Sequence, residues 1–505
     1  MRNEPRDILR RHFGYAGFRP GQEPLVRAVL SGRDALGVLP TGGGKSVCYQ
    51  VPALAMGGLC VVLTPLVSLM EDQVRRAGEV GLPAAFLSAG QSSRQRRATL
   101  QQARAGALNI LFVAPERLGT PGFLDALREA RVRLLAVDEA HCISEWGHDF
   151  RPAYREIGRV RDAVEAPVLA LTATATPRVR RDVEESLALR NPLRVVRSFD
   201  RPNLAWAVLA GGNLVARCRA VHRLLRRVAG VAVVYAPTRR AVEDVRDLLA
   251  SFGVRAEAYH AGLTPAERSS VQSTFMDDGC RVVVATNAFG MGIDKASVRL
   301  VAHIQLPGTL ESYYQEAGRA GRDGATAWCV AFRGPGDGLL AQGFVDRSHP
   351  PGWVLRRLHR RLKRLSGPGG DARLRAADIR SLSGPLGGVE ESLQGIAALA
   401  RAGAVRVLEG SLEEEQGTEP GSEGSQFLRV GVRNRLDLAS ALRLRRAALD
   451  KLRAVRRYAE ARTCRRREIL AYFGERARHG CGACDSCIFG GVPSSFSEQV
   501  PWTDI

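Results

Sequence analysis

Short apolar runs recur over the first 200 residues of the chain, and the stretches between them have the charged, periodic pattern of helices. Four such runs lie at residues 59–63, 110–113, 134–137 and 168–171. Runs of this length that alternate with helices are typical of strands buried in a parallel sheet. The pattern predicts an α/β domain over residues 1–200.

The same alternation starts again after residue 200. Apolar runs lie at residues 231–235, 255–259, 282–285 and 300–304, and helical segments separate them. Because the pattern repeats, we expect a second α/β domain over residues 201–345, in tandem with the first.

Beyond residue 345 the strand rhythm ends, and arginine-rich helical sequence follows at 353–365 and again at 435–462. The segment between these two helices has a different pattern, with helices first and then two strands. Helices followed by a β-hairpin predict a winged-helix-like domain inserted over residues 366–435. Its expected elements are helices at 376–382 and 389–402 and strands at 405–408 and 427–432.

The presumed wing of this insertion is acidic. It carries Glu413, Glu414, Glu415, Glu419 and Glu423. Carboxylates repel phosphates, so we interpret this stretch as a solvated loop rather than a nucleic-acid contact. The other helical residues lie at 346–365 and 436–490, and a tail follows at 491–505.

Length and charge add further expectations. At 505 residues the chain is too long for one hydrophobic core, since domains average about 150 residues. The net charge of +21 is far from ordinary and favours a polyanionic partner such as nucleic acid. No stretch approaches the roughly 18 consecutive apolar residues that span a membrane, and the N-terminus lacks the apolar core of a signal sequence. We expect a cytoplasmic, nucleoid-associated protein with no membrane partner.

A glycine-rich turn lies near the start of the first domain, where residues 40–46 read PTGGGKS. Backbone N–H groups of such a turn bind phosphate oxygens at a helix N-terminus, the lysine reaches the β- and γ-phosphates, and the serine hydroxyl can ligate Mg²⁺. The strict pattern has a glycine where Leu39 stands. The predicted ATP-binding residues in this turn are Thr41, Gly42, Gly43, Gly44, Lys45 and Ser46.

Lysine usage supports this interpretation. The 73 basic residues include four lysines, at positions 45, 295, 363 and 451, so arginine is the default cation of the chain. A lysine kept in the glycine turn is consistent with a compact ammonium group between phosphates, where a planar guanidinium would not fit.

Two carboxylates follow an apolar run of the first domain, where residues 138–141 read DEAH. Ligands of open α/β sheets bind at the carboxyl ends of the strands. There Asp138, with Ser46, can hold Mg²⁺, and Glu139 can polarise the water that attacks the γ-phosphate. The predicted catalytic residues of the first domain are therefore Lys45, Asp138, Glu139 and His141.

The second domain contributes QEAGRAGRDG at residues 315–324. Arg319 and Arg322 lie three residues apart, about one helical turn, so both guanidiniums can point the same way across a cleft. They are candidate arginine fingers. If ATP binding closes this cleft and hydrolysis reopens it, the reaction produces motion.

These motifs, in this order over most of residues 8–335, resemble the RecQ family of superfamily 2 DNA helicases. The resemblance implies two tandem RecA-like parallel-sheet domains and a helical zinc-binding domain, in which the helical residues 346–365 and 436–490 form one platform with the zinc site. It also implies that residues 13–23, FGYAGFRPGQE, read the adenine of ATP, with Gln22 as the selective amide and Arg19 nearby. Asp294 is expected at the ATP site as well.

The family's most diagnostic element is an aromatic-rich loop after DEAH, here CISEWGHDFRPAY at residues 142–154. Trp146 and Phe150 offer stacking faces to unpaired bases, and His148 and Arg151 can contact phosphate or respond to the ATP site. A core role for Trp146 is the alternative, although the polar residues around it favour an exposed loop. Glu145 stands where the family has glutamine.

Three further segments, 64–74, 171–176 and 282–299, resemble those that contact the nucleic-acid backbone and couple it to ATP. Within them the resemblance selects Thr172, Thr174, Thr286 and Gly290 as residues that bind DNA or couple it to the ATP site.

Four of the ten cysteines are clustered. Cys464 is followed after sixteen residues by CGACDSC, which contains Cys481, Cys484 and Cys487. Four thiolates at this spacing can close a tetrahedral Zn²⁺ site, and His479 is a competing ligand. A redox dithiol is the alternative, but it needs two cysteines and a thioredoxin-like context that is missing here.

The expected function is an ATP-dependent DNA helicase that moves along single-stranded DNA, 3′ to 5′ as the resemblance implies, in DNA recombination and repair. The expected cofactors are ATP, Mg²⁺ and Zn²⁺. The expected partners are single-stranded and tailed duplex DNA, a single-strand-binding protein and other repair proteins. Three alternatives stay open: an RNA helicase, a DNA-stimulated translocase with little unwinding, and a zinc-stapled scaffold without catalysis.

One departure from the family pattern affects these expectations. Residues 488–505 alone follow Cys487, so we expect no winged-helix domain after the zinc site, where long family members commonly have one. The insertion at 366–435 is interpreted as a relocated winged helix.

Overall fold

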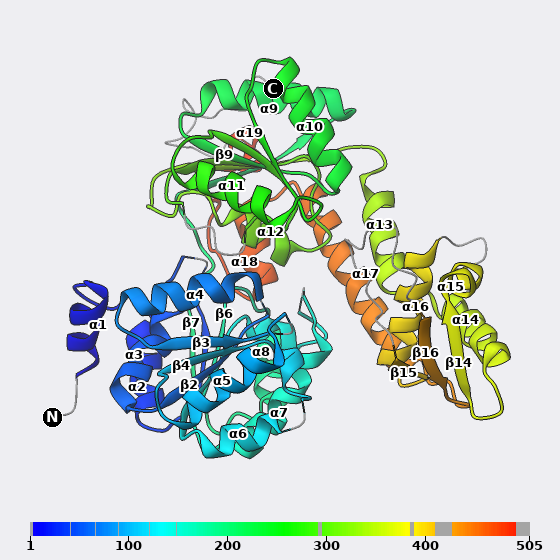
Figure 1. Cartoon of the computed structure of the whole chain (residues 1–505). Coiled ribbons are helices and arrows are strands. Elements are labelled where there is room, and N and C mark those ends of the chain that lie inside the picture. The colour runs from blue at the N-terminus through cyan, green and yellow to red at the C-terminus, as the bar shows by residue number, and fades with distance from the viewer. Residues whose placement is uncertain are drawn as a thin grey trace. The chain divides into compact units, whose positions relative to one another are not determined.

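The computed structural model describes residues 4–40, 42–65, 67–88, 90–120, 122–147, 149–290, 295–383, 388–409 and 427–490. The chain divides into two compact units: Met1–Gly334 with Tyr458–Ile505, and Pro335–Arg457 (Figure 1). Each unit has a hydrophobic core of its own.

The first unit begins with a seven-stranded sheet in the spatial order β3-β4-β2-β5-β6-β1-β7. Every neighbouring pair is parallel. All residues of β1, β2, β4 and β6 are buried, as expected for a sheet covered on both faces. The strands are β1 Ala35–Val38, β2 Leu59–Leu63, β3 Ala84–Leu87, β4 Ile110–Val113, β5 Val132–Val137, β6 Val168–Thr172 and β7 Leu193–Val196.

Helices connect these strands and cover the sheet (Figure 1). The helices are α1 Pro5–Phe13, α2 Gln22–Leu30, α3 Val47–Met56, α4 Val67–Glu79, α5 Ser93–Arg104, α6 Phe123–Glu129, α7 Ile157–Ala163 and α8 Pro177–Ser186, with short 3₁₀ turns η1 Pro115–Arg117, η2 Ala140–Ile143 and η3 Pro152–Glu156.

A second parallel sheet follows in the same unit, with six strands in the order β10-β11-β9-β12-β13-β8. The prediction of two tandem α/β domains is therefore confirmed. The elements are β8 Leu204–Ala210, α9 Leu214–Arg227, β9 Val231–Tyr235, α10 Arg239–Ser251, β10 Glu257–Tyr259, α11 Pro265–Met276, β11 Val282–Ala285, β12 Val298–His303, α12 Leu310–Ala317 and β13 Ala327–Arg333.

The second unit contains an antiparallel sheet in the order β14-β16-β15. Its elements follow the order helix, strand, helix, helix, strand, strand, which is that of a winged helix. They are α14 Gly352–Leu365, β14 Asp371–Arg375, α15 Ala376–Ser383, α16 Val389–Arg401, β15 Val405–Glu409 and β16 Phe427–Val432, and α13 Asp337–Ser348 precedes them. The acidic residues 413–423 lie outside the described residues.

The structure assigns α14 differently from the sequence pattern. Leu355, Leu358 and Leu362 are buried in one core with Leu374 and Ile396 of the winged-helix-like elements. The apolar stripe of α14 therefore forms part of the core of the second unit.

The long helix α17 Ala439–Glu460 leads out of the second unit, and α18 Arg465–Tyr472 and α19 Asp485–Phe489 complete the first. No helix among the described residues combines the length and the apolar character that a membrane span requires.

Candidate functional site

The glycine turn after β1 leads directly into α3. Val47 N donates to Gly44 O at 3.2 Å and Cys48 N to Lys45 O at 3.0 Å, so helical hydrogen bonding begins inside the motif. Gly42 and Gly44 have φ values of +78° and +70°, which favour glycine. A glycine turn at a helix N-terminus is an anion-binding arrangement. Thr41, predicted to bind ATP here, lies outside the described residues.

Arg19 and Gln22 hold this turn from the preceding segment. Gln22 Nε2 donates to Gly43 O at 3.0 Å and to Gly44 O at 2.9 Å, while Gln22 Oε1 accepts from Arg19 N at 2.7 Å. Arg19 Nη1 donates to Gly42 O. A Cβ at position 44 would lie 2.6 Å from Gln22 Nε2, so this contact requires glycine. Both residues predicted to recognise adenine therefore lie against the phosphate-binding turn.

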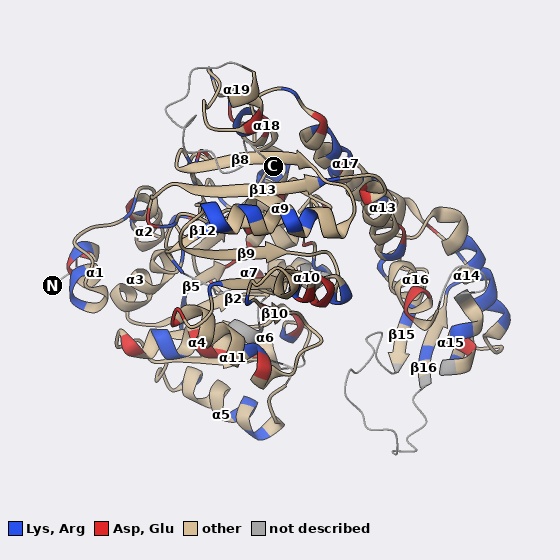
Figure 2. Cartoon of the chain, turned by 90° about the horizontal axis from the view of Figure 1, so that it is seen from above, with Lys and Arg blue, Asp and Glu red and all other residues tan. Residues whose placement is uncertain are grey.

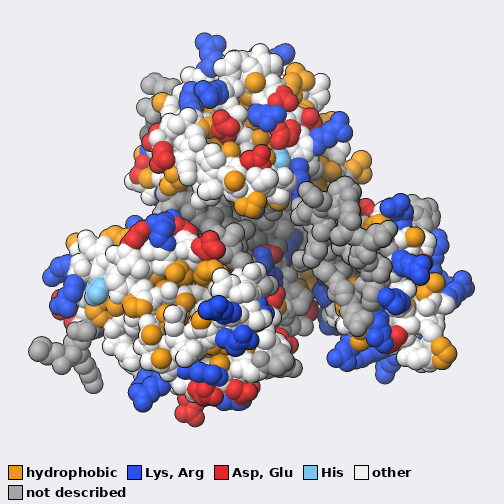
Figure 3. All heavy atoms as spheres, viewed as in Figure 1, with side chains coloured by type: hydrophobic (Ala, Val, Ile, Leu, Met, Phe, Trp, Pro, Cys, Tyr) orange, Lys and Arg blue, Asp and Glu red, His pale blue; other side chains and the backbone are white. Residues whose placement is uncertain are grey.

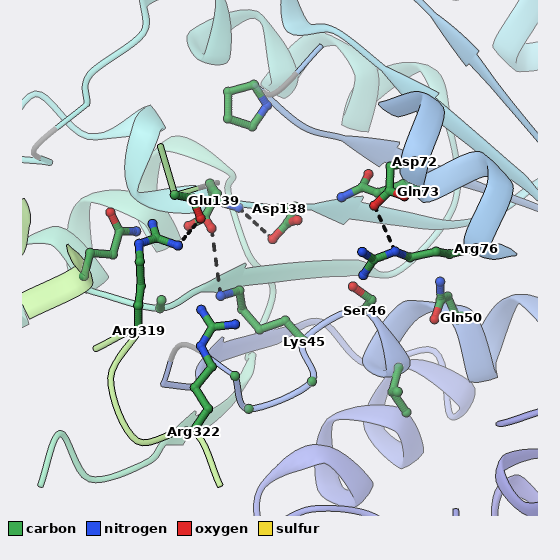
Figure 4. Close-up of a pocket in the computed structure, with 18 of the residues that line it drawn as sticks. Lys45, Ser46, Gln50, Asp72, Gln73, Arg76, Asp138, Glu139, Arg319 and Arg322 are labelled. Atoms are coloured by element: carbon green, nitrogen blue, oxygen red, sulfur yellow. Dashed lines mark hydrogen bonds and ion pairs between the residues drawn. The ribbon is translucent and has the colours of Figure 1, made fainter. Parts of the chain in front are cut away.

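Asp138 and Glu139 follow β5 at the carboxyl edge of the first sheet. Glu139 has φ +45° and ψ +46°, a left-handed conformation that costs a side-chain-bearing residue about 1–3 kcal/mol and is typical of functional sites. Lys45 Nζ lies 3.9 Å from Glu139 Oε1 (Figure 4). Burial, and secondly the charge of Glu139, raises the pKa of Asp138 to about 6. A bound cation would reverse this shift, so the carboxylates fit an oxygen-ligated cation.

His141 connects these carboxylates to the next strand. His141 Nδ1 lies 3.3 Å from Glu139 Oε2 and 2.9 Å from Oγ1 of Thr172, the last residue of β6. Thr172 Oγ1 donates to Thr174 O at 3.2 Å. His141, Thr172 and Thr174 are all buried, so neither threonine side chain is exposed for direct contact with nucleic acid.

Arg319 and Arg322 line the same cavity of about 490 Å³ as Lys45, Ser46 and Glu139. Figure 4 shows Arg319 extending toward Glu139 and Arg322 beside Lys45. The helical spacing expected for the arginines is wrong, because α12 ends at Ala317 and both lie in the turns that follow. A backbone carbonyl orients Arg319 instead, since its Nη1 donates to Gly290 O.

Gly290, predicted to bind DNA or to couple it to the ATP site, lies in the wall of the ATP cavity. A Cβ at this position would lie 2.3 Å from Arg319 Nη2, so glycine is required for the approach of the guanidinium. Thr286 holds the same turn, because its N donates to Tyr259 O and its O accepts from Phe289 N. Asp294, predicted at the ATP site, lies outside the described residues.

Sequence reasoning missed several residues of this cavity. Gln50 on α3 and Asp72, Gln73 and Arg76 on α4 line it (Figure 4). Arg76 Nε lies 2.8 Å from Asp72 Oδ2. Segment 64–74 was assigned to coupling as a whole, and the 72, 73, 76 spacing on one helix face was the signal that could have singled these residues out.

Tyr154 was also missed, although it ends the aromatic loop. Its hydroxyl donates to Asp138 O at 3.1 Å and its side chain is fully buried. Arg151 N donates to Cys142 O at 2.9 Å, and Arg151 Nη1 donates to Pro65 O at 2.9 Å. The loop is thereby closed on the DEAH turn, and the Arg151 side chain is bound to protein backbone.

Trp146 and Phe150 of this loop are partly exposed. The guanidinium carbon of Arg178, on α8, lies 3.1 Å from the centroid of the Trp146 ring. Phe150 is half-buried. His148 lies outside the described residues.

The four clustered cysteines come together at the start of α18 and around α19. Their Sγ atoms all lie within 4.8 Å of one another. Hydrogen bonds from the Cys481 and Cys484 thiols hold the pKa of Cys464 well below its usual value, and the same contact raises the pKa of Cys481 to about 11. One thiolate is thus stabilised by its neighbours, whereas further thiolates need a cation, so the set fits a tetrahedral metal.

The cysteine cluster is anchored to the second sheet. Arg465 and Asp485 form a buried ion pair, with Nε to Oδ1 at 2.9 Å. Asp485 Oδ2 also accepts from the backbone N of Val208 in β8 at 3.0 Å. Backbone N–H groups of Arg465 and Cys487 donate to Cys484 Sγ at 3.4 Å.

Comparison with known proteins gives three family matches along the chain. Residues 19–183 match the family described as DEAD/DEAH box helicase, residues 216–324 the helicase conserved C-terminal domain, and residues 430–488 the RecQ zinc-binding family. Among solved structures, S. cerevisiae Dbp5, bound to RNA and ADP BeF3, has a TM-score of 0.52 at 16% identity, covering 67% of this chain and 90% of Dbp5. At this identity the likeness shows the fold alone.

Two sequence relatives are much more similar. The ATP-dependent DNA helicase RecQ of Pasteurella multocida is 44% identical over 66% of this chain, and the chain spans 52% of its length. The probable ATP-dependent DNA helicase RecS of Bacillus subtilis is 40% identical over 67% of this chain and 68% of its own length. Together with the P-loop, the DEAH turn, the paired arginines and the cysteine cluster, these matches show that the chain belongs to the RecQ family of superfamily 2 helicases.

Proposed function

We propose that this protein is an ATP-dependent DNA helicase that moves along single-stranded DNA, with 3′ to 5′ polarity. The observation that carries the proposal is the meeting of Lys45, Glu139, Arg319 and Arg322 in one cavity, although they come from two different sheets. A nucleotide that contacts residues from both sheets can draw them together, and its hydrolysis releases them.

The ATP site supports hydrolysis by positioning and charge. Lys45 and the glycine turn bind and orient the phosphates, and Glu139 holds the attacking water in line. Arg319 and Arg322 stabilise the charge that develops on the transferred phosphoryl group. When bound, Mg²⁺ would be held near Ser46 and Asp138 and would neutralise phosphate charge.

Coupling to DNA runs through the residues behind the carboxylates. His141 contacts Glu139 on one side and Thr172 on the other, so a change at either end can be transmitted through a buried hydrogen bond. We assign single-strand sensing to Trp146 and Phe150, whose rings can stack on bases of any sequence.

A basic helix in the second unit supports DNA as the polyanionic partner. Arg356, Arg360, Lys363 and Arg364 are exposed on α14, and no ion pair involves any of the four among the residues that the structure describes. Figure 2 shows the row of basic positions along α14, and Figure 3 shows basic side chains gathered on the visible face of this unit. Such a face suits a phosphate backbone, so we assign DNA contact to it.

Zinc is proposed as a structural ion held by Cys464, Cys481, Cys484 and Cys487. The domain division follows: two RecA-like domains over 1–200 and 201–345, a winged-helix-like insertion whose core includes α14, and a zinc-binding part that ends near residue 490. A role in recombination and repair and partners such as a single-strand-binding protein stay predictions, as does a cytoplasmic, nucleoid-associated location.

The test is strand separation with ATP on duplexes that carry either a 3′ or a 5′ single-stranded tail, with Lys45→Ala as the control. Unwinding of the 3′-tailed duplex alone, lost in the variant, is the expected result. DNA-stimulated ATP hydrolysis without strand separation would contradict the proposal and favour a translocase. Equal stimulation by RNA would favour an RNA helicase, which the 40–44% identity to DNA helicases makes the less supported alternative.

A further inference from the structure

The Trp146 ring already has a partner in this structure. Arg178 lies over it with 3.1 Å between the guanidinium carbon and the ring centroid, the geometry of a stacked cation–π pair. The Arg178 side chain is otherwise exposed, and no ion pair or hydrogen bond of its side chain is found among the described residues. One face of the ring proposed to receive unpaired bases is therefore covered by a residue of the chain itself.

Contacts with neighbouring residues fix the positions of both Trp146 and Arg178. Trp146 lies on the loop closed by the Arg151 to Cys142 hydrogen bond, and a Cβ on its neighbour Gly147 would be 2.1 Å from His141 O. Arg178 is the second residue of α8, whose N-cap Thr176 accepts a hydrogen bond from Val179 N.

The first turn of α8 is also fixed from behind by the zinc-binding part. A Cβ on Gly474 would lie 2.6 Å from Pro177 Cγ, so the backbone of Gly474 packs closely against the proline ring. Arg180 Nη2 donates to Phe473 O at 3.2 Å. Pro177 is thus held in place directly before Arg178.

The segments that carry Trp146 and Arg178 are also connected at the ATP site. Trp146 lies on the loop that follows His141, and Arg178 lies on the segment that follows Thr172. His141 and Thr172 are hydrogen-bonded to each other at 2.9 Å. The Arg178–Trp146 contact is thus a second connection between the same two segments, in addition to the His141–Thr172 hydrogen bond. A ligand that separates the pair acts on a structure that includes His141 and, 3.3 Å away, Glu139.

We propose that Arg178 is a built-in competitor for the Trp146 ring, which a nucleobase of single-stranded DNA must displace before it can stack. The proposal rests on the assignment of Trp146 to single-strand sensing. A guanidinium and a base are both planar, so they exclude each other on the face of the indole that Arg178 covers. Arg178 sets the DNA concentration at which the motor responds, and it is a positioning residue rather than a catalytic one.

The competition predicts a specific effect of Arg178→Gln. Removal of an exposed cation–π partner should tighten binding of a labelled oligothymidylate about two- to five-fold, and lower the DNA concentration for half-maximal ATPase stimulation by the same factor. The matched control is Arg181→Gln, because Arg181 is exposed on the same helix and loses the same charge. That control should leave binding unchanged or slightly weaker.

A double-mutant cycle separates competition from a simple phosphate contact. In a Trp146→Ala background, Arg178→Gln should no longer tighten binding. Weaker binding on Arg178→Gln in both backgrounds would overturn the proposal in favour of a phosphate contact. An unchanged affinity in both would overturn it as well.

A spectroscopic readout does not depend on affinity. In protein labelled with 5-fluorotryptophan, the ¹⁹F resonance of Trp146, assigned from Trp146→Phe, should move on Arg178→Gln without DNA, and on addition of oligothymidylate to the unsubstituted chain. If Trp146→Ala leaves binding and ATPase stimulation intact, the competition is overturned, while strand separation that depends on Lys45 would still support the helicase.

Discussion

Arg319 reaches the ATP cavity because residue 290 has no side chain. The guanidinium occupies the space where a Cβ would lie, 2.3 Å from Nη2, and it donates to the carbonyl of the same residue. Glycine at position 290 is thus a condition for the arginine finger proposed above, although it carries no chemistry itself.

Gly290→Ala is therefore expected to act like partial loss of the finger. Loss of an arginine finger costs about 10³–10⁵ in kcat, so we expect DNA-stimulated kcat to fall at least about 100-fold, with nucleotide binding retained. Gly308→Ala is the control, since a Cβ there would meet nothing within 4 Å. A Gly290→Ala enzyme with unchanged kcat would show that Arg319 does not act in this position.

His349 is a second residue whose environment has a measurable consequence. Burial, followed by the charges of Arg401, Lys451 and Arg445, lowers its pKa to about 4. The folded chain therefore binds fewer protons here than the unfolded chain between pH 4 and the ordinary value near 6.5. Stability is then full above about pH 6.5 and is lost as the pH falls through this window.

His349→Asn should lessen this loss in acid. Between pH 7.5 and pH 5.0 the wild-type chain is expected to lose about 1–2 kcal/mol more than the variant, because the variant has no group to protonate at this position. Thermal unfolding of both proteins at the two pH values measures the difference. Equal losses of stability in both proteins would mean that folding does not lower the pKa of His349.

Most residues of the ATP site could be identified from the sequence, because each motif is recognised by the spacing of its own residues. Lys45, Glu139, Arg319 and Arg322, all selected from sequence motifs, line one cavity. What the sequence could not give is how they are oriented. The Arg319–Arg322 pair was placed on a helix, whereas the turns after α12 and the Gly290 carbonyl position it, and that carbonyl belongs to a segment about 30 residues away.

At the scale of elements, buried strands with unbroken apolar runs were the most predictable feature. Runs such as 59–63 and 110–113 are β2 and β4 without change of bounds. Strands β8 and β13 were not singled out, although both are as apolar, because an apolar run alone does not say which strands pair. Similarly, the apolar stripe of α14 does not say which core it joins, and its place in the second unit was missed.

The zinc-binding elements α18 and α19 are short, and the cysteine cluster is expected to hold them together. Cys484→Ser should abolish zinc binding and make residues 458–490 sensitive to protease, because structural zinc contributes about 10–16 kcal/mol to folding in small domains. Zinc content and limited proteolysis measure this. Nucleotide binding at Lys45 should persist, since none of the four cysteines lines that cavity.

Cys218→Ser is a suitable control for the zinc experiment. Cys218 is buried in the core of the second sheet and belongs to no metal-binding group among the described residues. This variant should keep its zinc. Retention of zinc by Cys484→Ser, or unchanged protease sensitivity, would contradict the structural role.

At the scale of the whole molecule, part of the net charge of +21 lies on the exposed face of α14. Four exposed basic residues on α14 have no ion-pair partner among the described residues, whereas Arg75 on α4, for example, pairs with Asp72. The double variant Arg360→Glu and Lys363→Glu should weaken duplex binding and make the slope of log K against log salt shallower by about 1–2.

Arg94→Glu with Arg97→Glu on α5 is the matched control, because both residues are exposed and the charge change is the same. Fluorescence anisotropy over a salt series measures both pairs. Equal slopes for the two double variants would show that the effect is one of net charge alone, and that α14 makes no particular contact.

The hydrogen bond from Val208 N to Asp485 has a consequence for how the chain can be divided. β8 is the outermost strand of the second sheet, and α18 and α19 contact it. A fragment that ended at Gly334 would leave LAWAVLA as an open sheet edge, a template on which another copy can add a strand. We therefore expect the residues after Tyr458 to limit aggregation of the two sheets as well, so the sheets are best produced with these residues attached.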